Sequence, residues 1–232
     1  MTEQSRRRTG ARTWTALAVA LAVVGVVALV LAVTGQERAP QPAATSDQIQ
    51  PATADRPAAA APRERAAPPA DAPADAPAAA APVAVTIPAI DVSSDLMRLG
   101  LNDDGTVEVP PLEPDDRAGW YELGPAPGDI GPATILGHVD SAEHGPGIFF
   151  DLGALQLGDE IEVARADGSV AVFAVDRVER HPKDEFPTIA VYGNTDDAQL
   201  RLITCGGDFD SAVRSYEDNV IAFATLVDTR PA

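Results

Sequence analysis

The sequence contains a single cysteine, Cys205, so no disulfide bond can form within the chain. Its folded part must therefore be held together by a hydrophobic core, for which about 150 residues are enough. A lone cysteine in an extracellular protein is either a small hydrophobic side chain of the core or a free thiol with a chemical role. Composition by itself leaves both interpretations open for Cys205.

Basic side chains are also scarce: 17 Lys and Arg stand against 35 Asp and Glu, which gives a net charge of −18. The net charge is +3 over residues 1–13, −2 over residues 34–82 and −19 over residues 83–232. This excess of negative charge in the C-terminal part excludes a nucleic-acid-binding protein, because neutralising phosphates requires the opposite sign. We interpret the charge as a contribution to solubility.

Charged residues are absent from residues 14–33, a run of twenty mainly apolar residues. Its length matches the hydrocarbon core of a bilayer, about 30 Å thick, and predicts a transmembrane helix. Four arginines lie in residues 1–13 and predict a cytoplasmic basic N-terminus. A cleaved signal peptide is the alternative, but the run exceeds the usual apolar region and Thr34-Gly35-Gln36 is a poor cleavage site.

Aromatic residues are missing from residues 39–82, where ten of the 21 prolines occur among many alanines. Such a segment has too few large apolar side chains to form a core and favours extended, partly polyproline-like conformations. We therefore predict a disordered Ala/Pro-rich linker over residues 34–82. It could act as a stalk that holds the next domain on the order of 100 Å from the bilayer.

Residues 83–232 form the predicted catalytic domain and show no long helical periodicity. They contain short β-type runs separated by turn residues, and about eight such strands predict an all-β, closed or nearly closed β-barrel. An immunoglobulin-like sandwich is the alternative, although its cysteine pair is missing. Asp104-Gly105 and Asp167-Gly168 predict hairpin turns. The predicted strands are 83–87, 96–101, 106–109, 133–138, 160–165, 170–178, 199–204 and 219–227, with short helices at 147–155 and 188–193.

Cys205 follows the apolar run 200–204 and precedes Gly206-Gly207. A strand that ends at a thiol and then turns on two glycines presents the sulfur at the end of a sheet, where a substrate can approach. From this position alone, a reactive thiol and a core thiol are equally supported.

A thiol nucleophile needs a proton-transfer partner and a donor for the oxyanion. His138 follows another apolar strand, whereas His144 and His181 lie in loop-like sequence. Arg214 lies nine residues after Cys205 and offers a planar, permanently charged donor group. Considered singly, His138 is more typical of a structural histidine and Arg214 of a surface ion pair.

Leu202-Ile203-Thr204-Cys205 resembles the Thr-Leu-x-Thr-Cys signature of sortases, with Arg201 in place of the first Thr. The resemblance extends over residues 83–227, and its pattern is most similar to class F sortases of high-GC Gram-positive bacteria. It implies an eight-stranded sortase-type β-barrel. The other segments that carry it are Ile87-Pro88-Ala89-Ile90, Gly137-His138-Val139-Asp140, Leu157-Gly158-Asp159, 205–210 and 216–219.

The resemblance implies that Cys205, His138 and Arg214 meet in a groove at one end of the barrel, with Thr204 orienting the substrate or the oxyanion. We predict no cofactor and no metal site. The segment 102–106 resembles a calcium loop, but the twelve-residue spacing to a terminal Glu is not met, so we interpret it as a hairpin turn. Substitution of the first Thr by Arg201 leaves this chemistry intact but weakens any assignment of the substrate class.

The expected activity is that of a membrane-anchored cysteine transpeptidase with an extracellular catalytic domain. It would cleave an LPXTG-like C-terminal sorting signal between Thr and Gly through a thioacyl-enzyme. It would then transfer the surface protein to a cell-wall precursor or another amine.

Other cysteine enzymes fit the sequence less well, because an L,D-transpeptidase motif of the Ser-His-Gly-Cys type is absent and a papain-like cysteine would begin a helix. The non-enzymatic alternative is an anchored cell-wall scaffold or adhesion domain with a buried core cysteine.

Overall fold

The computed structural model describes residues 38–42, 78–114 and 116–232. The predicted basic N-terminus (1–13), the predicted transmembrane helix (14–33) and most of the predicted linker (34–82) lie outside these residues. Within the described ranges, no helix is both long and apolar enough to cross a membrane. Contacts divide the chain after Arg38, and the architecture below concerns the unit Ala39–Ala232.

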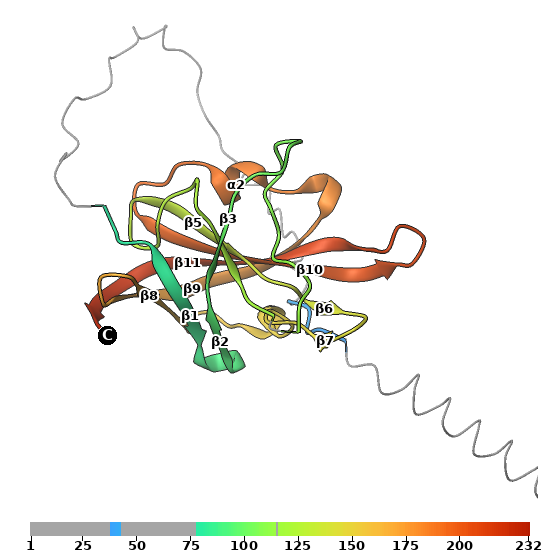
Figure 1. The fold of residues 1–232 in the computed structure, drawn as a ribbon, viewed down its shortest axis with the longest axis horizontal. Helices are drawn as coiled ribbons and strands as arrows, with labels where there is room; N and C mark the ends of the chain where they lie inside the picture. The colour runs from blue at the N-terminus through green and yellow to red at the C-terminus, as the bar shows by residue number, and fades with distance from the viewer. Residues whose placement is uncertain (1–37, 43–77, 115) are drawn as a thin grey trace, which may run out of the picture. The chain divides into compact units, whose positions relative to one another are not determined.

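The domain is built on a nine-stranded, mostly antiparallel sheet with the order β2-β1-β8-β9-β11-β10-β5-β4-β3 (Figure 1). Parallel pairs occur between β10 and β5 and between β3 and β4. A separate two-stranded ribbon joins β6 (Asp140–Ser141) to β7 (Gly145–Pro146). The strands of the main sheet are β1 (Pro82–Ile87), β2 (Val92–Asp95), β3 (Met97–Leu99), β4 (Gly119–Tyr121), β5 (Gly131–Leu136), β8 (Glu160–Arg165), β9 (Ser169–Pro182), β10 (Ala198–Asp210) and β11 (Ser215–Pro231).

The sheet is nearly closed, because its two edge strands follow each other in the chain. Only Leu96 separates β2 from β3, and its N–H donates to the carbonyl of Val83 in β1 at 2.9 Å. The next N–H, that of Met97, donates to Ala118 at 3.1 Å, just before β4. One continuous segment therefore belongs to both ends of the sheet, which confirms the predicted nearly closed barrel with nine strands in place of eight.

Most predicted strands are present, and β8 has the predicted bounds. The run 106–109 is the exception: it forms only an isolated bridge between Val107 and Leu101. Polar side chains explain this difference, because Asn102 and Asp104 bond to Thr106 and close a tight local turn. The turn at Asp104-Gly105 is therefore present, with Gly105 at a φ of +83°, but its arms are too short for a strand.

Helical structure is sparse in the described part of the chain, as predicted for residues 83–232. The α-helix α2 (Thr188–Tyr192) confirms the prediction at 188–193, whereas the longer stretch 147–155 contains only the 3₁₀ turn η2 (Leu152–Ala154). Two further 3₁₀ turns, η1 (Pro88–Ile90) and η3 (Lys183–Glu185), follow β1 and β9.

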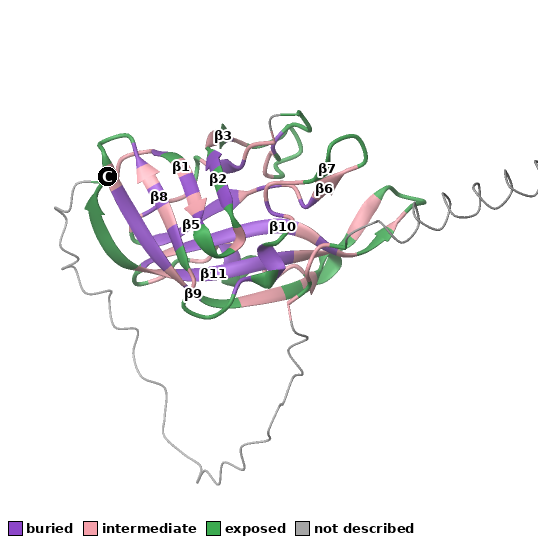
Figure 2. Ribbon diagram, turned by 90° about the horizontal axis from the view of Figure 1, so that it is seen from below, coloured by how far each residue is buried: buried purple, intermediate pink, exposed green. Residues whose placement is uncertain are grey.

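The two faces of the central strands carry different apolar clusters. On the inner face, alternate side chains of β5, β10 and β11 fill the barrel together with Phe149, Leu152 and Phe173. On the outer face, a smaller cluster of Ile203, Ile221, Phe223 and Val191 lies beneath α2, with Leu136, Phe186 and Tyr192 packed against it. Burial is highest along β10 and β11 and falls toward the tip of their hairpin (Figure 2).

Candidate active site

The parallel pair of β5 and β10 brings Cys205 and His138 to the same level. Leu202 is paired with Ile135 and Ile203 with Leu136, and the N–H of Gly137 continues the ladder by donating to Ile203 at 3.1 Å. Cys205 and His138 each follow two residues later, which extends the same register beyond the end of β5, where neighbouring chains lie about 4.8 Å apart. Since side chains alternate along a strand, both project to the outer face, like Ile203 and Leu136.

The antiparallel ladders extend this level across two more strands. Cys205 is paired with Asn219 of β11, and Asn219 is paired with His181 of β9. We call His138, Cys205, Asn219 and His181 the site row. Directly opposite residues on one face have Cβ atoms about 4.5–5.5 Å apart, so the Asn219 amide is a close neighbour of the thiol.

The Cys205 thiol is free and half-buried at the point where β10 leaves the regular ladder. The register shifts between Gly206 and Phe209, and Gly207 adopts a φ of +77°, which glycine tolerates best. The N–H of Gly207 donates to the side-chain oxygen of Gln41 at 3.1 Å. The thiol therefore lies at the end of the regular strand, beside a bend that glycine permits.

The imidazole of His138 is half-buried and its Nε2 lies 2.7 Å from the carbonyl oxygen of Pro110. Because a carbonyl only accepts hydrogen bonds, this contact places a proton on Nε2 and leaves Nδ1 as the second nitrogen of the ring. A small pocket opens beside His138, between the loop that contains Leu112 and Asp116 and the β6–β7 ribbon. The carbonyl of Pro110 thus fixes the imidazole on one side, and the pocket leaves the ring accessible to solvent on another.

Two residues after His138, Asp140 accepts a hydrogen bond of 2.5 Å from the hydroxyl of Tyr216 in β11. Burial raises the pKa of Tyr216, and the bond to Asp140 and the neighbouring Cys205 raise it further. The phenol therefore stays protonated and donates to the carboxylate. This contact ties the segment that carries His138 to the strand opposite Cys205.

The structure places Arg214 in the turn between β10 and β11, away from the level of the site row. It is exposed, has a φ of +54° and forms no hydrogen bond or ion pair with any residue in the described ranges. Asn219 is the residue opposite Cys205, and Arg214 lies five positions earlier in the sequence. At about 3.3 Å per residue, this separation is about 16 Å along the strand.

Thr204 is 4% exposed, and its hydroxyl has no hydrogen-bond partner among the described residues. It alternates with Cys205 and so shares the inner face with Leu202, which belongs to the barrel core. The side chain of Thr204 therefore points away from the face on which Cys205 and His138 lie.

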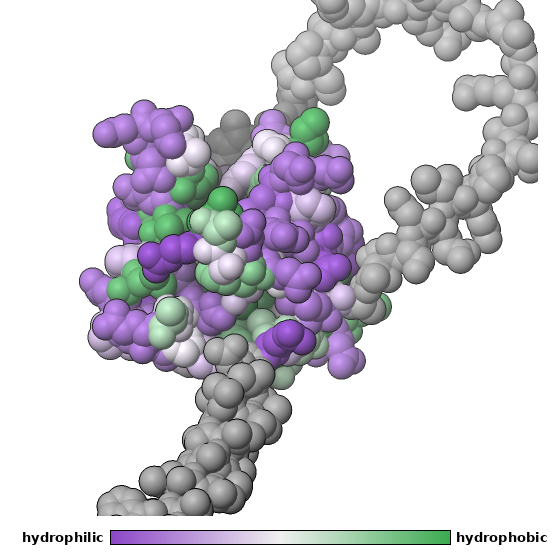
Figure 3. All heavy atoms as spheres, turned by 90° about the vertical axis from the view of Figure 1, so that its right-hand side faces the viewer, coloured by the Kyte–Doolittle hydropathy of each residue, from purple (hydrophilic) through white to green (hydrophobic). Residues whose placement is uncertain are grey.

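Next to the site row, the outer face is apolar. Leu136 and Ile203 lie two residues before His138 and Cys205 on the same face, and Tyr192 of α2 packs against them. Tyr192 also contacts the rings of Tyr121 and Phe186, with centroids 6.3 and 6.2 Å apart. Seen from the side toward which the β10–β11 hairpin points, the surface is mainly hydrophilic with small hydrophobic patches (Figure 3). The half-buried Leu136 and Tyr192 therefore form an apolar strip over the buried Ile203, next to the thiol.

No group of three His, Cys, Asp or Glu side chains suited to hold a metal ion is found in residues 38–42, 78–114 and 116–232. The pocket beside His138 contains Asp116, Asp140 and His144 without forming such a group. The arrangement at the site row is one of thiol, imidazole and amide.

Sequence reasoning missed Asn219 and Tyr216 as individual site residues, although both lie in a segment that carries the family resemblance. The apolar run 220–224 after Asn219 indicates a strand, but its register against β10 cannot be read from one sequence. Asn219 becomes a site residue only through its pairing with Cys205.

The family model that matches this chain describes sortases, and the solved structures described below are sortases as well. The sortase domain model matches residues 85–227. No curated protein sequence matches the chain.

Solved structures similar to this chain include sortase A of Listeria monocytogenes, with 20% identity, a TM-score of 0.48 and coverage of 66% of this chain and 91% of that chain. The SrtA sortase of Actinomyces oris is 21% identical, with a TM-score of 0.49 and coverage of 68% and 89%. A lid mutant of Corynebacterium diphtheriae sortase A is 21% identical, with a TM-score of 0.48 and coverage of 67% and 73%.

Proposed function

Because the chain belongs to the sortase family, whose members are cysteine transpeptidases, we propose that it cleaves an LPXTG-like sorting signal between Thr and Gly. It then transfers the new carboxyl end to an amine of a cell-wall precursor. Within the sortase family, we assign the chain to class F, and the similarity of its motifs to class F sortases supports this assignment.

One observation carries the proposal: the parallel β5–β10 ladder ends at the pair of Ile203 and Leu136, so Cys205 and His138 both follow two residues beyond the same point. A nucleophilic thiol needs a proton-transfer group within hydrogen-bonding reach during the reaction. Both side chains are half-buried, as a solvent-accessible reaction centre requires, whereas a core cysteine would be fully buried. The geometry thus favours the transpeptidase over a scaffold domain.

In the first half-reaction, the Cys205 thiolate attacks the carbonyl carbon of the Thr in the sorting signal. The C–N bond to Gly then breaks, the Gly amine leaves with a proton from His138, and a thioester remains on Cys205. In the second half-reaction, the acceptor amine attacks the thioester and gives a proton to His138. The Cys205 thiolate leaves and a new amide bond forms.

The oxyanion of each tetrahedral intermediate needs a hydrogen-bond donor. We assign this role to Arg214, which must then approach Cys205 by a bend of the hairpin tip. The shift in register after Gly206 and the positive φ values of Gly207 and Arg214 support such a bend. Thr204 would contribute through its backbone next to Cys205, because its side chain faces the core.

The apolar run 14–33 and the preceding arginines support a membrane anchor with an extracellular catalytic domain. Surface proteins that carry the sorting signal would reach the site row over the apolar strip of Leu136 and Tyr192. The proposed reaction needs no cofactor, because the thiol is the nucleophile and the thioester keeps the acyl group activated for the acceptor amine.

The proposal is tested by intact-mass spectrometry of the full-length protein in detergent, incubated with LPXTG-type peptides. We expect a thioacyl adduct on the wild-type protein, and a peptide–amine product after addition of triglycine or a diamino acid. Cys205→Ala should form no adduct, and His138→Ala should form it at least about a hundredfold more slowly.

Arg98→Ala is the control, because Arg98 is exposed, pairs with Glu122 and lies outside both the site row and the pocket beside His138; its rate should stay within about twofold of wild type. An adduct on Cys205→Ala, or no adduct on the wild-type protein with any LPXTG-type peptide, would contradict the proposed function.

A further inference from the structure

Four residues before Cys205, a second row crosses the outer face of the same strands. Arg201 of β10 is paired with Phe223 of β11, and Phe223 is paired with Arg177 of β9. Both guanidinium groups lie over the Phe223 ring, that of Arg177 at 3.7 Å and that of Arg201 at 4.7 Å from its centroid. Cation–π contacts of this kind hold a guanidinium against an apolar surface.

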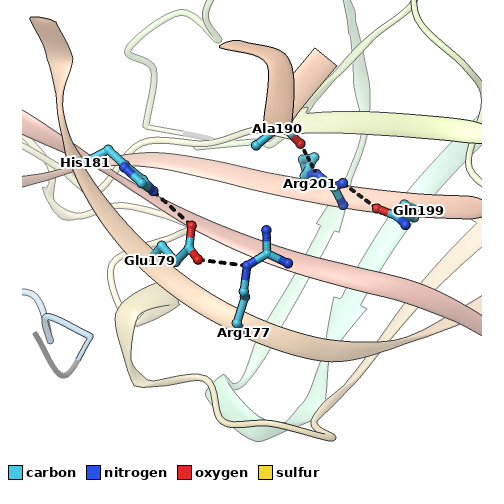
Figure 4. A network of polar contacts seen from close by, with 6 residues as sticks. All are labelled: Arg177, Glu179, His181, Ala190, Gln199 and Arg201. Atoms are coloured by element: carbon cyan, nitrogen blue, oxygen red, sulfur yellow. Dashed lines mark hydrogen bonds and ion pairs between the residues drawn. The ribbon is translucent and has the colours of Figure 1, made fainter. Parts of the chain in front are cut away.

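Arg201 is 4% exposed, which is unusual for a permanently charged side chain. Each of its three guanidinium nitrogens donates a hydrogen bond: Nε to the carbonyl of Ala190 at 3.2 Å, one terminal nitrogen to the carbonyl of Leu200 at 3.0 Å, and the other to the side chain of Gln199 (Figure 4). Burial of a charge is unfavourable unless such partners are present, and removing a partner leaves a strong penalty.

The two arginines are tolerated side by side because carboxylates lie near them. Arg177 forms an ion pair with Glu179 at 2.8 Å, and Glu179 also accepts from His181 at 2.9 Å (Figure 4). Burial lowers the pKa of Arg201 to about 10, with a further contribution from Arg177, so the group remains charged at neutral pH. The polar network thus runs along β9 from the level of Arg201 to His181 in the site row.

The contact from Arg201 to Ala190 holds α2. A helix of five residues is too short to be stable by itself, so its position depends on tertiary contacts. Its Val191 is completely buried against the outer cluster, and Tyr192 packs there beside Ile203. A cation near the last carbonyl groups of a helix stabilises this end. Arg201 supplies that cation from within the strand that ends at Cys205.

We propose that Arg201 is a positioning residue that sets α2 as the wall of the apolar strip beside Cys205 and so determines how tightly the sorting signal binds. This inference rests on the proposed peptide substrate. It also gives a role to the position at which the chain departs from the sortase signature, where Arg201 replaces a Thr. The guanidinium does not touch the reacting atoms, so its effect appears in binding.

The test compares Arg201→Thr and Arg201→Lys with wild type by steady-state kinetics of LPXTG-peptide cleavage. We expect Arg201→Thr to raise KM about tenfold with kcat within about twofold, and Arg201→Lys to recover part of the loss, because lysine restores the charge without the planar fork. Alkylation of Cys205 by a small neutral reagent should proceed at the wild-type rate. Hydrogen exchange should quicken in residues 188–193 in the absence of peptide.

Arg98→Thr is the matched control, since Arg98 of β3 is largely exposed and pairs with Glu122. Its KM and its hydrogen-exchange rates in residues 188–193 should equal those of wild type. An unchanged KM in Arg201→Thr, or equal losses of kcat and of the alkylation rate, would overturn the inference. If Arg201→Thr does not fold, Arg201→Lys decides by the same measurements. Failure of the proposed function is distinguishable, because it would show as absent cleavage by the wild-type protein.

Discussion

At the scale of single residues, the site combines a thiol, an imidazole and an amide in neighbouring positions. The pairing of Cys205 with Asn219 places an uncharged donor next to the thiol, whereas Arg214 occupies the hairpin turn. Both side chains can donate to an oxyanion, but only Arg214 carries a charge. The donor in the transition state can therefore be identified by substituting each in turn.

Arg214→Lys should lower kcat for LPXTG-peptide cleavage by about a hundredfold, because lysine lacks the planar fork that binds an oxyanion. The measurement is single-turnover formation of the thioacyl-enzyme, which separates chemistry from product release. Arg230→Lys is the control, since Arg230 pairs with Glu162 on the barrel surface. If Arg214→Lys retains wild-type rates while Asn219→Ala loses them, the amide of Asn219 is the donor and the role of Arg214 is wrong.

At the scale of elements, the β5–β10 pair and the β6–β7 ribbon together position His138. The ribbon returns the chain so closely that a Cβ atom on Gly147 would lie 2.5 Å from the carbonyl oxygen of His138. The N–H groups of Gly147 and Phe149 donate to Val139 and His138, which holds the backbone of this segment from behind. Glycine at 147 is therefore required for the close approach.

Gly147→Ala should displace the backbone of His138, because the atoms it meets belong to the main chain and cannot rotate away. We expect kcat/KM for peptide cleavage to fall at least about tenfold, since small displacements of a catalytic group are costly. The melting temperature should also fall. Gly100→Ala is the control: its Cβ would lie 3.4 Å from the end of the Glu108 side chain, an ordinary contact. Wild-type activity of Gly147→Ala would show that the ribbon does not position the histidine.

At the scale of the whole molecule, the negative charge is the dominant feature. Residues 83–232 carry a net charge of −19, and the ion pairs of the described residues, such as Arg98–Glu122, lie mostly at the surface. Self-repulsion of this kind destabilises a compact state, and salt screens it over a Debye length of about 10 Å at 0.1 M.

The melting temperature should therefore rise by several degrees, about 3–6 °C, between 20 mM and 0.5 M NaCl. Differential scanning calorimetry of the full-length protein in uncharged detergent measures it. Neutralising two exposed carboxylates, with Asp184→Asn and Glu185→Gln together, should raise the melting temperature at low salt and have less effect at high salt. A melting temperature that falls with added NaCl would show that attractive ion pairs dominate.

The sequence by itself determined the local features of this protein. Alternating apolar residues predicted strands such as 160–165, because period-two patterns report local backbone geometry. The turns at Asp104-Gly105 and Asp167-Gly168 followed from the conformational freedom of glycine. The motif around Cys205 and the segment with His138 predicted the family through residue types alone. The strand predicted at 106–109 was wrong, because the side chains of the turn form hydrogen bonds within the turn and the flanking residues are too few to pair as strands.

Only the tertiary structure decided which residues share a face and a level. The parallel register of β5 and β10 brings His138 to the level of Cys205. The register of β11 places Asn219 opposite Cys205, although Arg214 is closer to Cys205 in sequence. The tertiary structure also shows that Arg201, which departs from the sortase signature in sequence, is a buried residue that contacts α2. Strand register and contacts between elements join residues that are far apart in the sequence. Their free energies depend on how the whole domain packs, which a local sequence pattern does not encode.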